Sequence, residues 1–292
     1  MTLPHTQLFW PTLAVILTGT LWGFYWVPVR QIAAGGLPGA WGTLAIVAAA
    51  TLVLTPFAIR GRAALVASSP IALASVALGG FAFVLYSVGF LYGRVAIIVI
   101  LFFLTPVWST LIGWIFMGWQ ISRLRLFALL FGIAGLALML GANGEIPVPR
   151  GLGEWLGLAS GFLWSVATTG IRVKATAGPG ETAFVFAAGA TLGALILAPS
   201  LEPVPDLAAM PNPAFLRLSA LGTGALWWGL SIAALMWAAT QLEPARVGIL
   251  LMTEVMIASV SAALIAGETL SMLEVAGGSL VIIAGVIEVS KD

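Results

Sequence analysis

Ten stretches of the sequence are long and apolar enough to cross a lipid bilayer as helices. A membrane-spanning helix needs about 20 mostly apolar residues, and turn-forming residues separate the stretches. The chain has a mean hydropathy of +1.10 and 8% charged residues, whereas soluble proteins carry about 25%. The sequence therefore predicts an all-α integral membrane protein with ten transmembrane helices, at residues 9–32, 40–58, 70–91, 95–117, 124–141, 154–173, 181–199, 215–240, 244–266 and 271–289.

The distribution of basic residues predicts the orientation of these helices. Lysine and arginine accumulate on the cytoplasmic side of membrane proteins. With the N-terminus inside, eight basic residues are cytoplasmic and four are external, which accounts for all twelve: Arg60, Arg62, Arg123, Arg125, Arg172, Lys174, Arg246 and Lys291 inside, and Arg30, Arg94, Arg150 and Arg217 outside. Because ten is an even number of spans, both termini are expected in the cytoplasm.

Two patterns recur once in each half of the chain. The first pattern is Gly19, Leu21, Trp22 and Arg30, which recurs as Gly161, Leu163, Trp164 and Arg172. The second is the segment 104–107, which is similar to the segment 252–255. This repetition predicts two five-helix units, residues 1–145 and 146–292. Because five is odd, the second unit begins on the opposite side of the membrane. Such inverted repeats enclose a substrate site near the bilayer midplane in many secondary transporters.

Glu254 is the only charged residue between Val247 and Ala266. A carboxylate at that depth costs roughly 2.5–3.5 kcal/mol on insertion scales, so it usually faces a bundle interior or a wet cavity. Two functional interpretations follow: the carboxylate binds the ammonium group of a substrate, or it exchanges a proton as the cavity alternates. The structural alternative is a protonated carboxyl group hydrogen-bonded to a neighbouring helix.

Tryptophan is unusually frequent near the centres of the predicted spans. Tryptophan normally gathers at the two membrane interfaces, but one set lies near the span centres: Trp22, Trp108, Trp164, Trp227 and Trp228. A cavity wall of indole rings would stack on aromatic or bulky apolar substrates and attract an amino group by a cation–π contact of about 0.5–2 kcal/mol. Core packing or lipid contact is the alternative.

Further candidate residues lie on polar stripes of the first and sixth spans. Residues at intervals of four share one helical face, which groups Thr18, Trp22, Trp26 and Arg30, and likewise Ser160, Trp164, Thr168 and Arg172. Each arginine is expected at a mouth of the cavity, where it would meet a substrate carboxylate or extend to lipid headgroups. Pro106 kinks the fourth span and is a candidate gate, unless packing absorbs the kink. Tyr86 is a further candidate for the cavity lining.

The chain resembles the ten-helix EamA-type members of the drug/metabolite transporter superfamily. The resemblance rests on Gly-x-Leu-Trp at 19–22 and 161–164, Leu-Thr-Pro-Val at 104–107, and Ala-Gly-Glu at 266–268. It implies a basket of helices 1–4 and 6–9 around a central cavity, with helices 5 and 10 as outer supports. Within the superfamily the chain is similar to bacterial aromatic amino-acid exporters. Members commonly have proline where this chain has Glu254, so no ion-coupling scheme is carried over.

Several kinds of chemistry lack the residues they need. The chain has no cysteine, and its single histidine, His5, precedes the first span. No span holds a pair of acidic residues at metal-ligand spacing, and no phosphate-binding loop is present. These absences argue against an enzyme, a metal site or a cofactor. No lysine or arginine lies deep in a span, which disfavours anionic sugar-phosphate and nucleotide-sugar substrates. A net charge of +1 gives no indication of nucleic-acid binding.

The resulting prediction is a secondary transporter of the bacterial inner membrane that exports amino acids by alternating access. Its expected substrates are aromatic or bulky neutral amino acids, and its other expected partner is membrane lipid, with a monomer favoured. The alternatives are an exporter of hydrophobic cations or toxic metabolites, and a non-transporting membrane scaffold.

Overall fold

The computed structural model describes residues 5–118, 123–142, 144, 148–171, 177–206, 208, 210–242 and 244–289. In this part of the chain, helices form ten rods and no strand occurs. The first five rods are α1–α2 (His5–Gly23, Trp26–Ala34), α3 (Ala40–Arg60), α5 (Pro70–Tyr92), α6–α7 (Val95–Phe102, Thr105–Met117) and α8 (Arg123–Leu140), with α4 (Arg62–Ala67) as a short connection between the second and third.

The other five rods begin with α9 (Leu152–Ile171) and α10 (Pro179–Leu201). They continue with α11–η2–α12 (Pro213–Thr223, Gly224–Ser231, Ile232–Ala239), α13–α14 (Pro244–Leu251, Thr253–Ala266) and α15 (Met272–Val289). The ten predicted spans correspond one for one to these rods. The predicted boundary between the two units, at residues 145 and 146, lies outside the described residues.

Seven of the rods are long and apolar enough to cross a membrane by length and composition. Shorter apolar stretches cover Leu126–Leu140 in α8 and Met272–Ile287 in α15. The remaining rod, α9, is less apolar because Glu154 and several glycines, serines and threonines dilute its hydrophobic residues. α9 packs against α5, α6 and α7, so much of its surface contacts protein.

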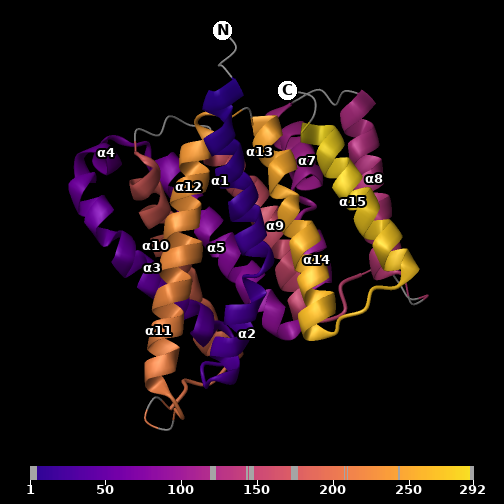
Figure 1. The fold of residues 1–292 in the computed structure, drawn as a ribbon. Coiled ribbons are helices and arrows are strands. Elements are labelled where there is room, and N and C mark those ends of the chain that lie inside the picture. The colour runs from indigo at the N-terminus through magenta and orange to yellow at the C-terminus, as the bar shows by residue number, and fades with distance from the viewer. Residues whose placement is uncertain are drawn as a thin grey trace.

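The second half of the bundle starts at the end opposite to the first half. In Figure 1, α1 begins and α15 ends at the top, which we call the terminal end, while α2 and the last turn of α14 lie at the bottom, which we call the opposite end. Gly153 at the start of α9 packs on Gly93, just after α5. Since α5 is the third rod and finishes at the opposite end, α9 starts there. The halves therefore have inverted topology.

Small residues let the rods approach closely. A Cβ atom on Gly80 of α5 would overlap the carbonyl oxygen of Phe186 in α10, and one on Gly189 would overlap the backbone of Ala77. Close approach through small residues is a common way for membrane helices to associate. At one edge of the bundle, α8 and α15 pack on each other (Figure 1). They are the fifth and tenth rods, so the expected outer position of these two helices is confirmed.

The fourth and ninth rods are broken at equivalent places. The hydroxyl of Thr105 donates to the carbonyl oxygen of Phe102 at 2.7 Å, and that of Thr253 donates to Leu250 at 2.8 Å. Both rods end on a glycine with φ 66° and ψ 21°, Gly118 in α7 and Gly267 in α14, in the left-handed conformation that glycine adopts without steric cost. This local identity is what a duplicated five-helix unit predicts.

The close packing of α5 on α10 gives a stability prediction. Gly80→Ala is expected to lower the free energy of unfolding by about 1–3 kcal/mol, because the added methyl group must displace backbone. Gly222→Ala is the matched control, since nothing lies within 4 Å of a Cβ atom at Gly222. Thermal unfolding in detergent measures both variants. Equal unfolding temperatures for the two would show that α5 and α10 do not approach as described.

Candidate functional site

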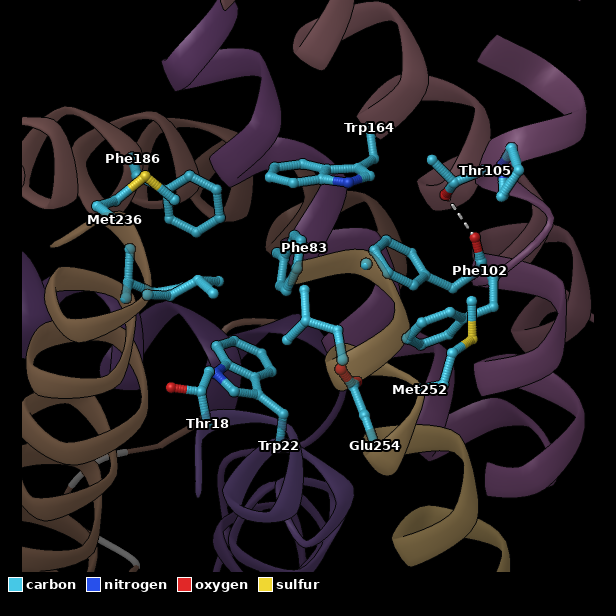
Figure 2. Close-up of a pocket in the computed structure, with 16 residues that line it drawn as sticks. Thr18, Trp22, Phe83, Phe102, Thr105, Trp164, Phe186, Met236, Met252 and Glu254 are labelled. Carbon is cyan, nitrogen blue, oxygen red and sulfur yellow. Dashed lines mark hydrogen bonds between the residues drawn. The ribbon is translucent and has the colours of Figure 1, made fainter. Parts of the chain in front are cut away.

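A cavity of about 200 Å³ lies between the two halves. Side chains from seven rods line it, and most of them are aromatic or aliphatic (Figure 2). The lining residues are Thr18, Trp22, Phe83, Phe102, Phe103, Thr105, Pro106, Trp164, Phe186, Ile232, Leu235, Met236, Gly248, Leu251, Met252 and Glu254. The expected central cavity is therefore present, although the second rod, α3, supplies no residue to its wall.

Phe83 lies at the centre of the aromatic part of the wall and contacts four other rings. Its ring centroid lies 4.9 Å from Trp22, 5.1 Å from Trp164, 5.2 Å from Phe102 and 5.3 Å from Phe186, and every pair is edge-to-face. Figure 2 shows Phe83 between Trp164 and Trp22. This geometry places the positive edge of one ring against the negative face of the next, and each such pair contributes about 0.5–1.5 kcal/mol beyond its burial.

Among the described residues that line the cavity, Glu254 is the only ionisable one. It follows the break at Met252 and lies in the first turn of α14, where the helix dipole favours negative charge. The hydroxyl of Tyr86 donates to its Oε1 atom at 2.6 Å, and both residues are buried. Tyr86 therefore fixes the direction of the carboxyl group. In the described part of the chain, Tyr86 is the one hydrogen-bond donor to this carboxyl group.

Five of the candidate residues from the sequence meet at this cavity: Thr18, Trp22, Pro106, Trp164 and Glu254. The indole N–H of Trp22 donates to the hydroxyl of Ser231 at 2.9 Å, which fixes its ring. Pro106 lies in the first turn of α7, where its missing N–H removes no helical hydrogen bond. The fourth rod therefore breaks just before this proline, at Phe103 and Leu104, and the break contributes Phe103 to the wall.

Trp227 and Trp228 are directed at the first rod rather than into the cavity. Both belong to η2, a π-helix. The indole N–H of Trp227 donates to the carbonyl oxygen of Leu21 at 2.8 Å, and that of Trp228 donates to the hydroxyl of Tyr25 at 2.9 Å. These tryptophans join the first and eighth rods, and they do not line the cavity described above.

The other candidates lie away from the cavity lining. Trp26 is buried and donates to Ser261, and Trp108 packs edge-to-face on Phe162. Thr168 donates to carbonyl oxygens of its own helix. Arg30 pairs with Glu268 at 3.2 Å. Arg172, the second candidate for a mouth of the cavity, lies outside the described residues.

Sequence reasoning missed Phe83, Phe102 and Phe186, which form much of the wall. A phenylalanine in an apolar span is common on lipid-facing and core-facing surfaces alike, so its residue type carries little information. Phe83 lies three residues before Tyr86 and shares its face of α5. Because Tyr86 was a candidate for the cavity lining, this spacing could have indicated Phe83 as well.

Two inverted halves that enclose a central cavity are an arrangement found in many secondary transporters. The model of the EamA-like transporter family matches residues 9–141, the stretch that holds the first five rods. A crystal structure of another protein shares the fold, with a TM-score of 0.56 and 16% sequence identity over 97% of this chain and 96% of that one. No curated protein matches the chain.

Proposed function

We propose that the protein exports amino acids with aromatic or bulky neutral side chains by alternating access. The observation that carries this proposal is one carboxyl group in the wall of a small aromatic cavity between the two halves. An amino acid of this kind has an ammonium group for the carboxylate and an apolar side chain for the rings.

The ammonium group has two sources of attraction in the cavity. Glu254 offers a carboxyl group that Tyr86 holds in one direction, and charge-assisted hydrogen bonds of this kind contribute roughly 1.5–3 kcal/mol. The faces of Trp22 and Trp164 add cation–π attraction. The volume of about 200 Å³ is below the roughly 300–1,000 Å³ of pockets that hold drug-sized ligands. This size supports a small substrate.

The described residues of the cavity lining offer hydroxyl groups to a substrate carboxylate, and none of them is a lysine or an arginine. Thr18 is the better-placed donor, because the hydroxyl of Thr105 already donates to Phe102. A site with an acid and no base also suits a hydrophobic amine that lacks a carboxylate. This observation makes an exporter of hydrophobic cations the second candidate function.

The direction of transport follows from the predicted orientation. The lining residue Thr18 lies on the terminal side of Trp22 in the first rod, and Gly248 lies on the terminal side of Glu254 in the ninth rod. With both termini in the cytoplasm, as the basic residues predict, the cavity lies towards the cytoplasm. A cavity loaded from that side supports export across the bacterial inner membrane.

The substrate class is tested with three compounds that share one ring. In proteoliposomes, phenylalanine is expected to be transported, and phenethylamine, which lacks the carboxylate, is expected to compete weakly. Phenylpropionate, which lacks the amino group, is expected to compete least, because it places an anion against Glu254. Strong transport of phenethylamine with no flux of phenylalanine would favour the hydrophobic-cation function. Transport of phenylpropionate alone would contradict both.

The role of the carboxyl group is tested by Glu254→Gln. Loss of a hydrogen bond to charge, roughly 1.5–3 kcal/mol, is expected to lower the apparent affinity for phenylalanine about tenfold or more. Glu154→Gln is the matched control, since Glu154 binds the backbone of Arg150 outside the cavity. Uptake is measured with and without an imposed pH gradient. If Glu254→Gln keeps both the flux and its pH dependence, the carboxyl group neither binds substrate nor exchanges protons.

A further inference from the structure

Two ion pairs join the halves of the bundle, and both lie at the opposite end. Arg30 of α2 pairs with Glu268, just after α14, and Arg94, between α5 and α6, pairs with Glu274 of α15. Hydrogen bonds to Glu274 raise the pKa of the Arg94 guanidinium above its ordinary value. In each pair the cation comes from the first half and the anion from the second. Among the described residues, no ion pair joins the halves at the terminal end.

The Arg30–Glu268 pair ties four helices together. Besides its 3.2 Å contact with Glu268, the Arg30 guanidinium donates to the carbonyl oxygens of Phe90 and Gly93 and lies 5.1 Å from the centre of the Trp26 ring. Glu268 also accepts the backbone N–H of Val95 at 3.0 Å, at the start of α6. The pair therefore connects α2, the end of α5, the start of α6 and the end of α14.

A buried layer of hydrogen-bonded side chains lies between this pair and the cavity. The indole N–H of Trp26 donates to Ser261 at 2.9 Å, and that of Trp228 donates to Tyr25 at 2.9 Å. The hydroxyl groups of Tyr25 and Ser87 are 3.0 Å apart. All five residues are buried, so the path from the cavity to the opposite end is filled by side chains.

We propose that the Arg30–Glu268 pair is the latch of a gate at the opposite end, and that this structure is the state whose cavity is directed to the terminal end. The inference rests on the proposed alternating-access function. Opening the opposite end requires α2 and α14 to separate, which breaks the pair. Side chains of Arg30 and Glu268 are 32% and 11% exposed, and partly exposed pairs are weak enough for water to replace. The latch can therefore break once in each transport cycle.

The latch is tested by chemical access to single cysteines, which the chain, having none of its own, permits. Ser87→Cys reports on the closed layer, and Thr18→Cys reports on the cavity from the terminal side. A membrane-impermeant thiol reagent is applied to either face of proteoliposomes. Adding Glu268→Gln or Arg30→Gln is expected to speed labelling of Ser87→Cys from the opposite end about tenfold, a shift of roughly 1.4 kcal/mol, and to slow labelling of Thr18→Cys.

Opposed changes at the two cysteines separate gate opening from loss of fold, because a loosened protein would label faster at both. Glu154→Gln, which removes an acid at the same end and leaves the Arg30–Glu268 and Arg94–Glu274 pairs in place, is expected to change neither rate. Unchanged labelling at Ser87→Cys, or faster labelling at both cysteines, would overturn the latch. The assay uses no substrate, so it remains decisive if phenylalanine proves not to be transported.

Discussion

Burial of the Glu254 carboxyl group is the constraint around which the site is built. A carboxyl group in the middle of a membrane helix is stable only with hydrogen-bond partners or a polar cavity. Tyr86 supplies one hydrogen bond at 2.6 Å. This bond requires α5 to face the start of α14 at close range. Glycines allow α5 to approach α10 closely enough for Phe83 and Phe186 to meet edge-to-face beside it. The packing of α5 thus places both the hydrogen bond and the aromatic wall.

The equivalent breaks in the fourth and ninth rods explain how two halves with the same backbone geometry present different side chains to the cavity. Irregular backbone inside a membrane is tolerated where it is covered by protein or lines a cavity, and both breaks supply residues to the cavity wall. At each break, the threonine hydroxyl group donates to the carbonyl oxygen of the residue three positions earlier, from Thr105 in one half and from Thr253 in the other. The next position is Pro106 in one half and Glu254 in the other. The repeat therefore preserves the backbone geometry while a single position supplies the acid.

The sequence predicted the rods and the burial of Glu254 because both depend on local properties. Hydropathy over about 20 residues marks a span, and an isolated acid within one must face inward. The Tyr86–Glu254 hydrogen bond joins positions 168 apart, and such a contact leaves no trace in the neighbouring sequence. Trp227 and Trp228 were expected in the cavity wall but do not line it. They lie in η2, and a π-helix has a wider turn than an α-helix. A π-helix shifts the side-chain register, and a pattern of 3.6 residues per turn cannot reveal it.

The central claim is that the Glu254 carboxyl group receives the amino group of the substrate. Solid-state NMR in lipid can measure the distance from the carboxyl carbon of labelled Glu254 to the nitrogen of bound ¹⁵N-phenylalanine. The account predicts direct hydrogen-bond contact, with about 2.7–2.9 Å between the nitrogen and a carboxyl oxygen. Bound phenylalanine with its nitrogen remote from Glu254, while the carboxyl group keeps only its hydrogen bond to Tyr86, would contradict it.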